Sequence, residues 1–134
     1  MSDKPRIVIL DDDEIFASLI TESLGVDCEV VIGRNGREGI QLCLGGRTDL
    51  LITDIGMPEL DGIQMLQEFQ KDPRLTGIPV IVVTATHFSR QNRSDVNRYP
   101  QVRDIIHKSS ALDAIVQEVQ KALKEPRGSG PEPK

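Results

Sequence analysis

The stretch Leu50-Leu51-Ile52-Thr53-Asp54 decides the fold, because it is a short run of strand-forming residues that ends on a carboxylate. A second run, Ile7-Val8-Ile9-Leu10, ends in the same way on Asp11, Asp12 and Asp13. Short apolar runs of this kind are typical of strands buried on both faces of a sheet. Two such strands that both end in acids would bring like charges together, and that cluster would need a cation to offset the repulsion.

Segments typical of strands and of helices alternate along the rest of the chain. We expect strands at 6–10, 28–32, 49–53, 79–83 and 104–107, and helices at 13–24, 37–44, 62–71 and 110–124. The helix at 13–24 carries an apolar stripe made of Ile15, Phe16, Leu19, Ile20 and Leu24. Residues 86–100 are polar and weakly patterned, and we expect a short or irregular helix there. Five βα units with short connections predict an α/β fold with a doubly wound, five-stranded parallel sheet.

Length and composition limit the classes of protein to which the chain can belong. Its 134 residues correspond to one domain, expected at 1–125, and residues 126–134 have the composition of a disordered tail or the start of a linker. The net charge of −5 argues against direct binding of nucleic acid by this segment. We find no apolar run of the roughly 20 residues that cross a membrane, and no apolar signal segment at the N-terminus. We therefore expect a cytoplasmic protein without membrane contact.

The expected sheet brings polar residues together at one edge. In doubly wound sheets, ligands bind outside the carboxyl ends of the strands. The residues that follow strands here are Asp11, Asp12, Asp13, Asp54, Thr84 and Lys108. Oxygen ligands without His or Cys select Mg²⁺ or Mn²⁺. With one carboxylate as nucleophile, and Lys108, Thr84 and backbone N–H groups near Gly56 as donors, the set predicts a phosphoryl-transfer site.

Each of these residues also has a purely structural interpretation. Asp12 or Asp13 could do no more than cap the following helix. A lysine after a strand is usually a solvated charge, and a threonine there is usually a strand former. For any one residue alone the structural interpretation is the better one, but it does not explain why Asp54, Thr84 and Lys108 all occur at the same end of their strands.

Four motifs carry a resemblance to a known family. They are Ile9-Leu10-Asp11-Asp12-Asp13-Glu14, the D-x-x-M-P-x-x-D-G pattern at 54–62, Val82-Val83-Thr84-Ala85 and Ile106-His107-Lys108. With these motifs the chain resembles, over about residues 6–124, the receiver domain of two-component response regulators. The resemblance implies a (βα)5, flavodoxin-like receiver fold and a role in bacterial phosphorelay signalling.

The resemblance also implies a role for each site residue. Asp54 would be the phosphoacceptor, Thr84 the switch hydroxyl, and Lys108 the partner of a phosphoryl oxygen. The implied ligands of Mg²⁺ or Mn²⁺ are Asp11, Asp12, Asp54 and the backbone carbonyl of Gly56. The implied output face consists of Thr86, Phe88, Tyr99, Ile105 and His107.

Two positions depart from the family pattern. Ser109 follows Lys108 where the family usually has proline, so a trans peptide bond is the default there. Ile105 occupies the position of the family's switch aromatic, and isoleucine cannot swing between buried and exposed states as an aromatic ring does.

The resemblance implies a signalling phosphoacceptor and not an enzyme; at most, the chain would promote its own phosphorylation and dephosphorylation. A histidine kinase or histidine phosphotransfer protein would donate the phosphoryl group. A downstream protein or a fused output domain would respond to it. The sequence leaves open whether the chain dimerises through its last helix and the neighbouring strand.

Two other interpretations stay open at this point. One is a degenerate receiver that acts as a binding module without phosphorylation. The departures at Ile105 and Ser109 favour it, whereas the presence of all the site residues argues against it. The other is a phosphatase of the haloacid dehalogenase type, since 11–15 loosely fits its D-x-D-x-[TV] signature. Against the phosphatase, Ile15 replaces the Thr or Val of that signature, and Asp54 would have no role in it.

Overall fold

The computed structural model of the chain describes residues 4–54, 62–84, 96, 98–108, 110 and 112–124. The strands are β1 (Arg6–Leu10), β2 (Glu29–Gly33), β3 (Leu50–Asp54), β4 (Val80–Thr84) and β5 (Val102–His107). The helices are α1 (Glu14–Leu24), α2 (Gly36–Leu44), α3 (Gly62–Phe69) and α5 (Leu112–Lys124), and a 3-10 turn, η1 (Gly25–Asp27), follows α1. These elements begin and end within two residues of the positions expected from the sequence. The irregular helix expected at 86–100 lies mostly outside the described residues.

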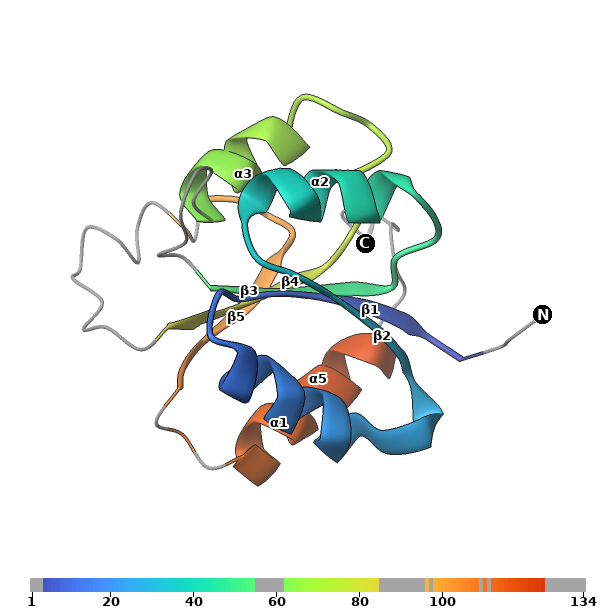
Figure 1. Cartoon of the computed structure of the whole chain (residues 1–134). Helices are drawn as coiled ribbons and strands as arrows, with labels where there is room; N and C mark the ends of the chain where they lie inside the picture. The colour runs from blue at the N-terminus through green and yellow to red at the C-terminus, as the bar shows by residue number, and fades with distance from the viewer. Residues whose placement is uncertain are drawn as a thin grey trace.

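The strands form one parallel sheet in the order β2-β1-β3-β4-β5. From β1 the chain first adds β2 on one side and then crosses to add β3 on the other, so the winding reverses between β1 and β3 (Figure 1). This confirms the doubly wound α/β fold. In such folds the crevice for a ligand opens at the carboxyl ends of the two strands where the winding reverses.

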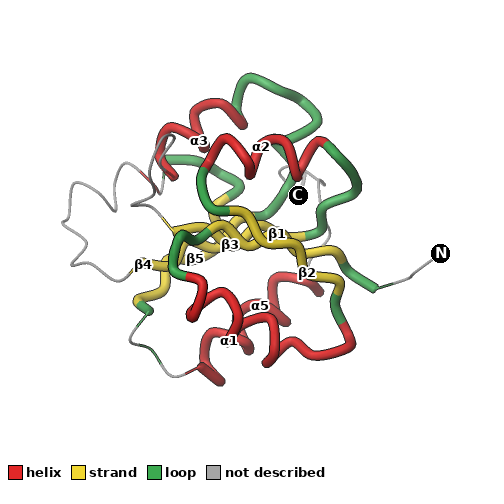
Figure 2. The backbone as a smooth tube through the Cα atoms, in the orientation of Figure 1, coloured by secondary structure: helices red, strands yellow, loops and turns green. Residues whose placement is uncertain are grey.

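The sheet is covered on both faces, which explains why its central strands are almost wholly apolar. Figures 1 and 2 show α1 and α5 on one face and α2 and α3 on the other. Alternate residues of a strand point to opposite faces. In β1, Ile7 and Ile9 therefore join the core under α1 and α5, while Val8 and Leu10 join the core under α2 and α3.

Local signals fix both ends of α1. The Asp13 side chain accepts hydrogen bonds from the backbone N–H groups of Ile15 (3.1 Å) and Phe16 (3.2 Å), as expected of an N-cap. The helix ends at Gly25, whose φ of 66° lies in the left-handed region that favours glycine. The N–H of Gly25 donates to the carbonyl of Thr21. The capping role that the sequence offered to Asp12 or Asp13 therefore belongs to Asp13.

The apolar stripe expected on α1 is only partly buried. Ile20 and Leu24 lie in the core together with Ala17, whereas Ile15 is 75% and Leu19 45% exposed. A helix packed on a sheet buries only part of its circumference, and this apolar stripe is wider than the buried part. Its outer members therefore remain exposed to solvent.

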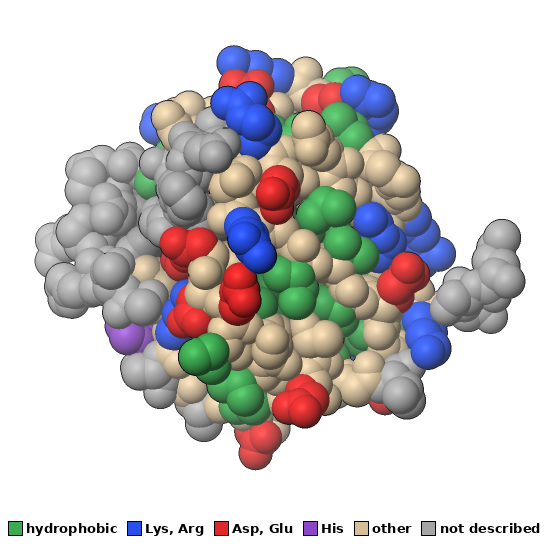
Figure 3. Space-filling model, viewed as in Figure 1, with side chains coloured by type: hydrophobic (Ala, Val, Ile, Leu, Met, Phe, Trp, Pro, Cys, Tyr) green, Lys and Arg blue, Asp and Glu red, His purple; other side chains and the backbone are tan. Residues whose placement is uncertain are grey.

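The surface carries charges of both signs. On the face seen in Figure 3, basic side chains are interspersed with acidic ones, with small hydrophobic patches between them. No helix among the described residues is long and apolar enough to cross a lipid bilayer.

Candidate functional site

The pairing of β1 with β3 brings the first acidic residues together. Leu10 is paired with Thr53, so the next residue on each chain segment, Asp11 and Asp54, lies at the same sheet edge. Both are buried, with 1% and 8% exposure, whereas Asp12 is exposed. Asp11, Asp12 and Asp54 each offer a carboxylate oxygen, and these oxygens lie within 4.8 Å of one another.

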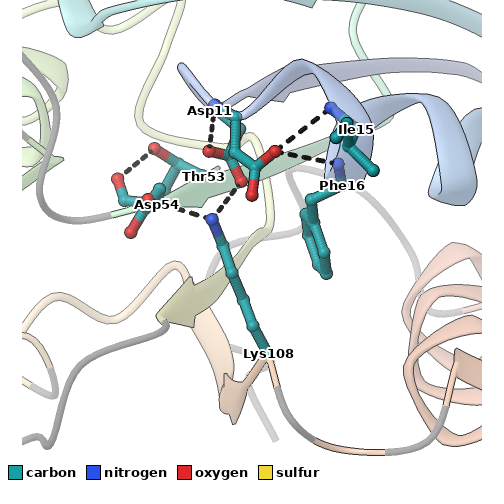
Figure 4. Close-up of polar contacts among 7 residues, drawn as sticks. Asp11, Ile15, Phe16, Thr53, Asp54 and Lys108 are labelled. Carbon is teal, nitrogen blue, oxygen red and sulfur yellow. Dashed lines mark hydrogen bonds and ion pairs between the residues drawn. The ribbon is translucent and has the colours of Figure 1, made fainter.

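The Lys108 side chain extends to the acidic group of Asp11, Asp12 and Asp54 from the end of the edge strand β5. It directly follows β5, where its backbone N–H donates to the carbonyl of Thr84 at 2.8 Å. Its Nζ atom lies 2.6 Å from Asp11 Oδ2 and 3.2 Å from Asp54 Oδ2 (Figure 4). The Lys108 side chain is only 11% exposed, so this ammonium group is largely removed from water.

Burial and charge act in opposite directions on the Asp11–Lys108 pair. Burial raises the pKa of Asp11, and the close ion-pair contact with Lys108 offsets only part of that rise. Burial by itself lowers the pKa of Lys108, but the ion-pair contacts with Asp11 and Asp54 raise it above its ordinary value. Lys108 is therefore held as a cation, and Asp11 is a carboxylate whose charge is incompletely compensated.

The carboxylate group fits a hard divalent cation. Asp11 Oδ2 is buried and lacks a hydrogen-bond donor of good geometry among the described residues, so the charge of Lys108 is its main support. Lys108 contacts two of the grouped carboxylates, Asp11 and Asp54, and the third, Asp12, lies beside them, so the group carries more negative charge than this one ammonium offsets. Asp11, Asp12 and Asp54 could hold such an ion, because oxygen ligands suit Mg²⁺ or Mn²⁺.

Asp13 supports the site but does not belong to it. Its backbone N–H donates to Asp11 Oδ1 at 2.9 Å, while its own carboxylate caps α1. The turn between β1 and α1 thus orients one oxygen of Asp11 and leaves the other to face Lys108.

The remaining expected residues occupy the last two strands. Thr84 is buried at the end of β4 and is paired with His107, which is exposed on β5. Ile105 and Tyr99 are both half-buried and pack against the core under α2 and α3. Four further positions lie outside the described residues: Gly56, Thr86, Phe88 and Ser109.

One neighbour of the site was not expected from the sequence. The ring of Phe16 lies beside the Lys108 ammonium, with 4.8 Å from Nζ to the ring centroid (Figure 4). In the sequence Phe16 is simply one member of an apolar helical stripe. No pattern there distinguishes it from a core residue, because the contact depends on how α1 packs beside the end of β5.

Comparison with known proteins indicates the family to which the chain belongs. The family model of the response regulator receiver domain matches residues 7–120. The chain is 33% identical over 84 residues to the DNA-binding dual master transcriptional regulator RpaA of Synechocystis, covering 60% of this chain and 34% of that protein. It is 30% identical over 84 residues to the sensor histidine kinase TmoS of Ectopseudomonas mendocina, covering 63% of this chain and 9% of that protein. The chain therefore spans about a third or less of these relatives.

A solved structure extends the match to nearly the whole fold. The phosphorylated cyanobacterial phytochrome response regulator RcpA superposes with a TM-score of 0.74 at 28% sequence identity. The superposition covers 88% of this chain and 90% of that one. Since the family model spans most of the chain, this chain belongs to the response regulator receiver domain family, a signalling family of two-component systems.

Proposed function

We propose that the chain is a cytoplasmic phosphoacceptor that receives a phosphoryl group on Asp54 from a histidine kinase or a histidine phosphotransfer protein. One observation carries the proposal: the Asp54 carboxylate lies at the sheet edge with an ammonium 3.2 Å from Oδ2 and two other Asp carboxylates beside it. A nucleophile, a counter-charge and a set of metal ligands thus occupy one site.

The transfer step requires little covalent chemistry from the protein. An oxygen of Asp54 attacks the phosphorus of a phosphohistidine, forming an O–P bond as the P–N bond breaks. The electron pair of that P–N bond returns to the imidazole, which leaves as a neutral ring once it carries a proton. Charge on the equatorial oxygens must be stabilised throughout. Lys108 is suited to this, because it is held as a cation beside Asp54.

A divalent cation at Asp11, Asp12 and Asp54 would supply the remaining positive charge. The backbone carbonyl of Gly56 is a further ligand that the family pattern suggests. The Asp13 N–H would keep Asp11 oriented through Oδ1. Thr84, at the end of β4, is the hydroxyl that we expect to turn toward the phosphoryl group.

The response to phosphorylation would start at the ends of β4 and β5. Thr84 and Lys108 are joined there by a backbone hydrogen bond of 2.8 Å, so a movement of one affects the other. Phosphorylation would shift an existing two-state equilibrium of this region. The output face would be formed by Thr86, Phe88, Tyr99, Ile105 and His107.

The relatives support a modular setting for this step. One is a sensor histidine kinase and another a DNA-binding regulator, and each is longer than the part that matches. We propose that residues 1–125 act as the receiver domain and that 126–134 are a tail or lead to an output partner. The structural neighbour RcpA is described in a phosphorylated state, which fits a phosphoacceptor role.

Phosphorylation with a small donor tests the proposal directly. With Mg²⁺ and acetyl phosphate, the intact protein should gain the mass of one phosphoryl group, and Asp54→Asn should gain none. Asp13→Asn is the matched control, because it removes one carboxylate from the same turn and leaves a side chain that still caps α1. If Asp54→Asn is modified, or binds beryllofluoride, as well as the wild type, the proposal is wrong.

A further inference from the structure

Among the residues that the structure describes, three side chains contact the Lys108 ammonium, and two of them are acids. Asp11 Oδ2 lies at 2.6 Å and Asp54 Oδ2 at 3.2 Å, while the Phe16 ring centroid lies at 4.8 Å. A cation within about 6 Å of a ring centroid is attracted by the negative face of the ring. Because the lysine side chain is only 11% exposed, water screens this attraction poorly.

The three neighbours would respond differently to a metal ion. A divalent cation at the carboxylate group would neutralise Asp11 and Asp54 and would also repel the ammonium. The Phe16 ring carries no net charge and has no atom that would coordinate the metal ion. Of the three contacts, the one with Phe16 is therefore the least altered when the carboxylates are occupied.

The position of the ring is tied to the site by backbone geometry. The Phe16 N–H bonds to the Asp13 carboxylate at 3.2 Å, and the Asp13 N–H bonds to Asp11 Oδ1 at 2.9 Å. The first turn of α1 thus places the Phe16 backbone relative to Asp11. Phe16 is also packed against the core under α1 and α5, which restricts its side chain.

We propose that Phe16 is a positioning residue, whose ring face holds the Lys108 ammonium beside Asp54 when a divalent cation occupies the carboxylates. The proposal rests on the proposed function, because it concerns how Lys108 is kept in reach of a phosphoryl group on Asp54. The ring prevents the lysine from being driven into solvent by the metal. It therefore acts through Lys108 and does not touch the reacting atoms.

Two substitutions separate this role from simple core packing. Phe16→Leu keeps an apolar side chain against the core but removes the ring. Phe16→Tyr keeps the ring face and adds one hydroxyl. Ile20→Val is the matched control, because it trims a buried side chain one turn further along α1 and leaves the ring in place.

The first measurement follows the ammonium group itself. The ¹H–¹⁵N signal of the Lys108 side chain is identified by its loss in Lys108→Arg, and each variant is recorded with and without Mg²⁺. We expect the signal to persist with Mg²⁺ in the wild type, Phe16→Tyr and Ile20→Val, and to broaden beyond detection in Phe16→Leu. A wild-type signal that disappears with Mg²⁺, or a Phe16→Leu signal that persists, overturns the proposal.

The second measurement is the affinity for beryllofluoride in the presence of Mg²⁺. Loss of a largely desolvated cation–π contact should weaken binding about threefold to thirtyfold in Phe16→Leu, with Phe16→Tyr restoring it. Equal affinity of Phe16→Leu and the wild type counts against the positioning role. If the wild type itself does not bind beryllofluoride, the proposed function fails, and the ammonium signal with Mg²⁺ still decides the role of Phe16.

Discussion

Lys108 Nζ lies 2.6 Å from Asp11 Oδ2, so the lysine that follows strand β5 forms an ion pair with the aspartate that follows strand β1. The contact spans the sheet from β1 to β5, passing over the ends of β3 and β4. If a divalent cation binds the Asp11 carboxylate, as we propose, it competes with the Lys108 ammonium for that group. We therefore expect Lys108 to hold the metal-free site together and to move away from Asp11 when a metal ion binds.

Removing the lysine should destabilise the metal-free protein. Lys108→Met removes the ammonium that contacts the buried Asp11 and Asp54, and breaking a buried ion pair costs about 3 kcal/mol of unfolding free energy. Urea denaturation in EDTA measures the difference. Lys121→Met, at an exposed position on α5, should change little. Equal stabilities of the two variants would contradict an important role for the buried ion pair.

Mg²⁺ should stabilise the folded protein through the carboxylate group. At 100 times its dissociation constant, a ligand of the native state adds about 2.7 kcal/mol to the free energy of unfolding. Asp12→Asn should lose most of this gain, because it removes one of the three carboxylates. Asp13→Asn should keep it, since Asp13 caps α1. Thermal unfolding across a Mg²⁺ titration measures both, and an equal loss in the two variants would argue against the assigned ligands.

The burial of Asp11 should give the metal-free protein a characteristic pH dependence. The pKa of Asp11 is raised above 3.8 by burial, so the folded state binds this proton more tightly than the unfolded state. The stability that Asp11 contributes therefore falls as the pH rises from 3.8 through the raised folded pKa. Over that window Asp11→Asn should gain stability relative to the wild type, and above it the difference should level off. Urea midpoints of both proteins in EDTA at a series of pH values test this. If Asp11→Asn instead loses stability relative to the wild type as the pH rises, the pKa of Asp11 is lowered in the folded state.

The close approach of α2 to β1 should make Gly39 intolerant of a side chain. A Cβ atom at Gly39 would overlap Leu10 Cδ1, inside the core. Gly39→Ala should therefore lower the free energy of unfolding by about 1–3 kcal/mol through overpacking. At Gly46 the nearest atom to an added Cβ is 3.6 Å away, so Gly46→Ala is the control and should be close to neutral. Similar urea midpoints for the two variants would mean that α2 can shift at little cost.

The sequence by itself determined the order of the elements and the edge at which the site lies. The apolar runs ending at Leu10 and Thr53 specify buried parallel strands, and parallel strands place their following acids at one edge. The expectation of a single sheet with helices on both faces followed from that alternation alone.

Only the tertiary structure decided which side chains meet. The position of Lys108 against Asp11 depends on how the ends of β1 and β5 are placed in the sheet, and the contact of Phe16 with the lysine depends on how α1 packs beside the end of β5. The exposure of Ile15 has the same origin, because the periodicity of a helix shows that it has an apolar face but not which part of that face is covered. Contacts between residues as far apart as Phe16 and Lys108 leave no local pattern, since they arise when separate elements pack together.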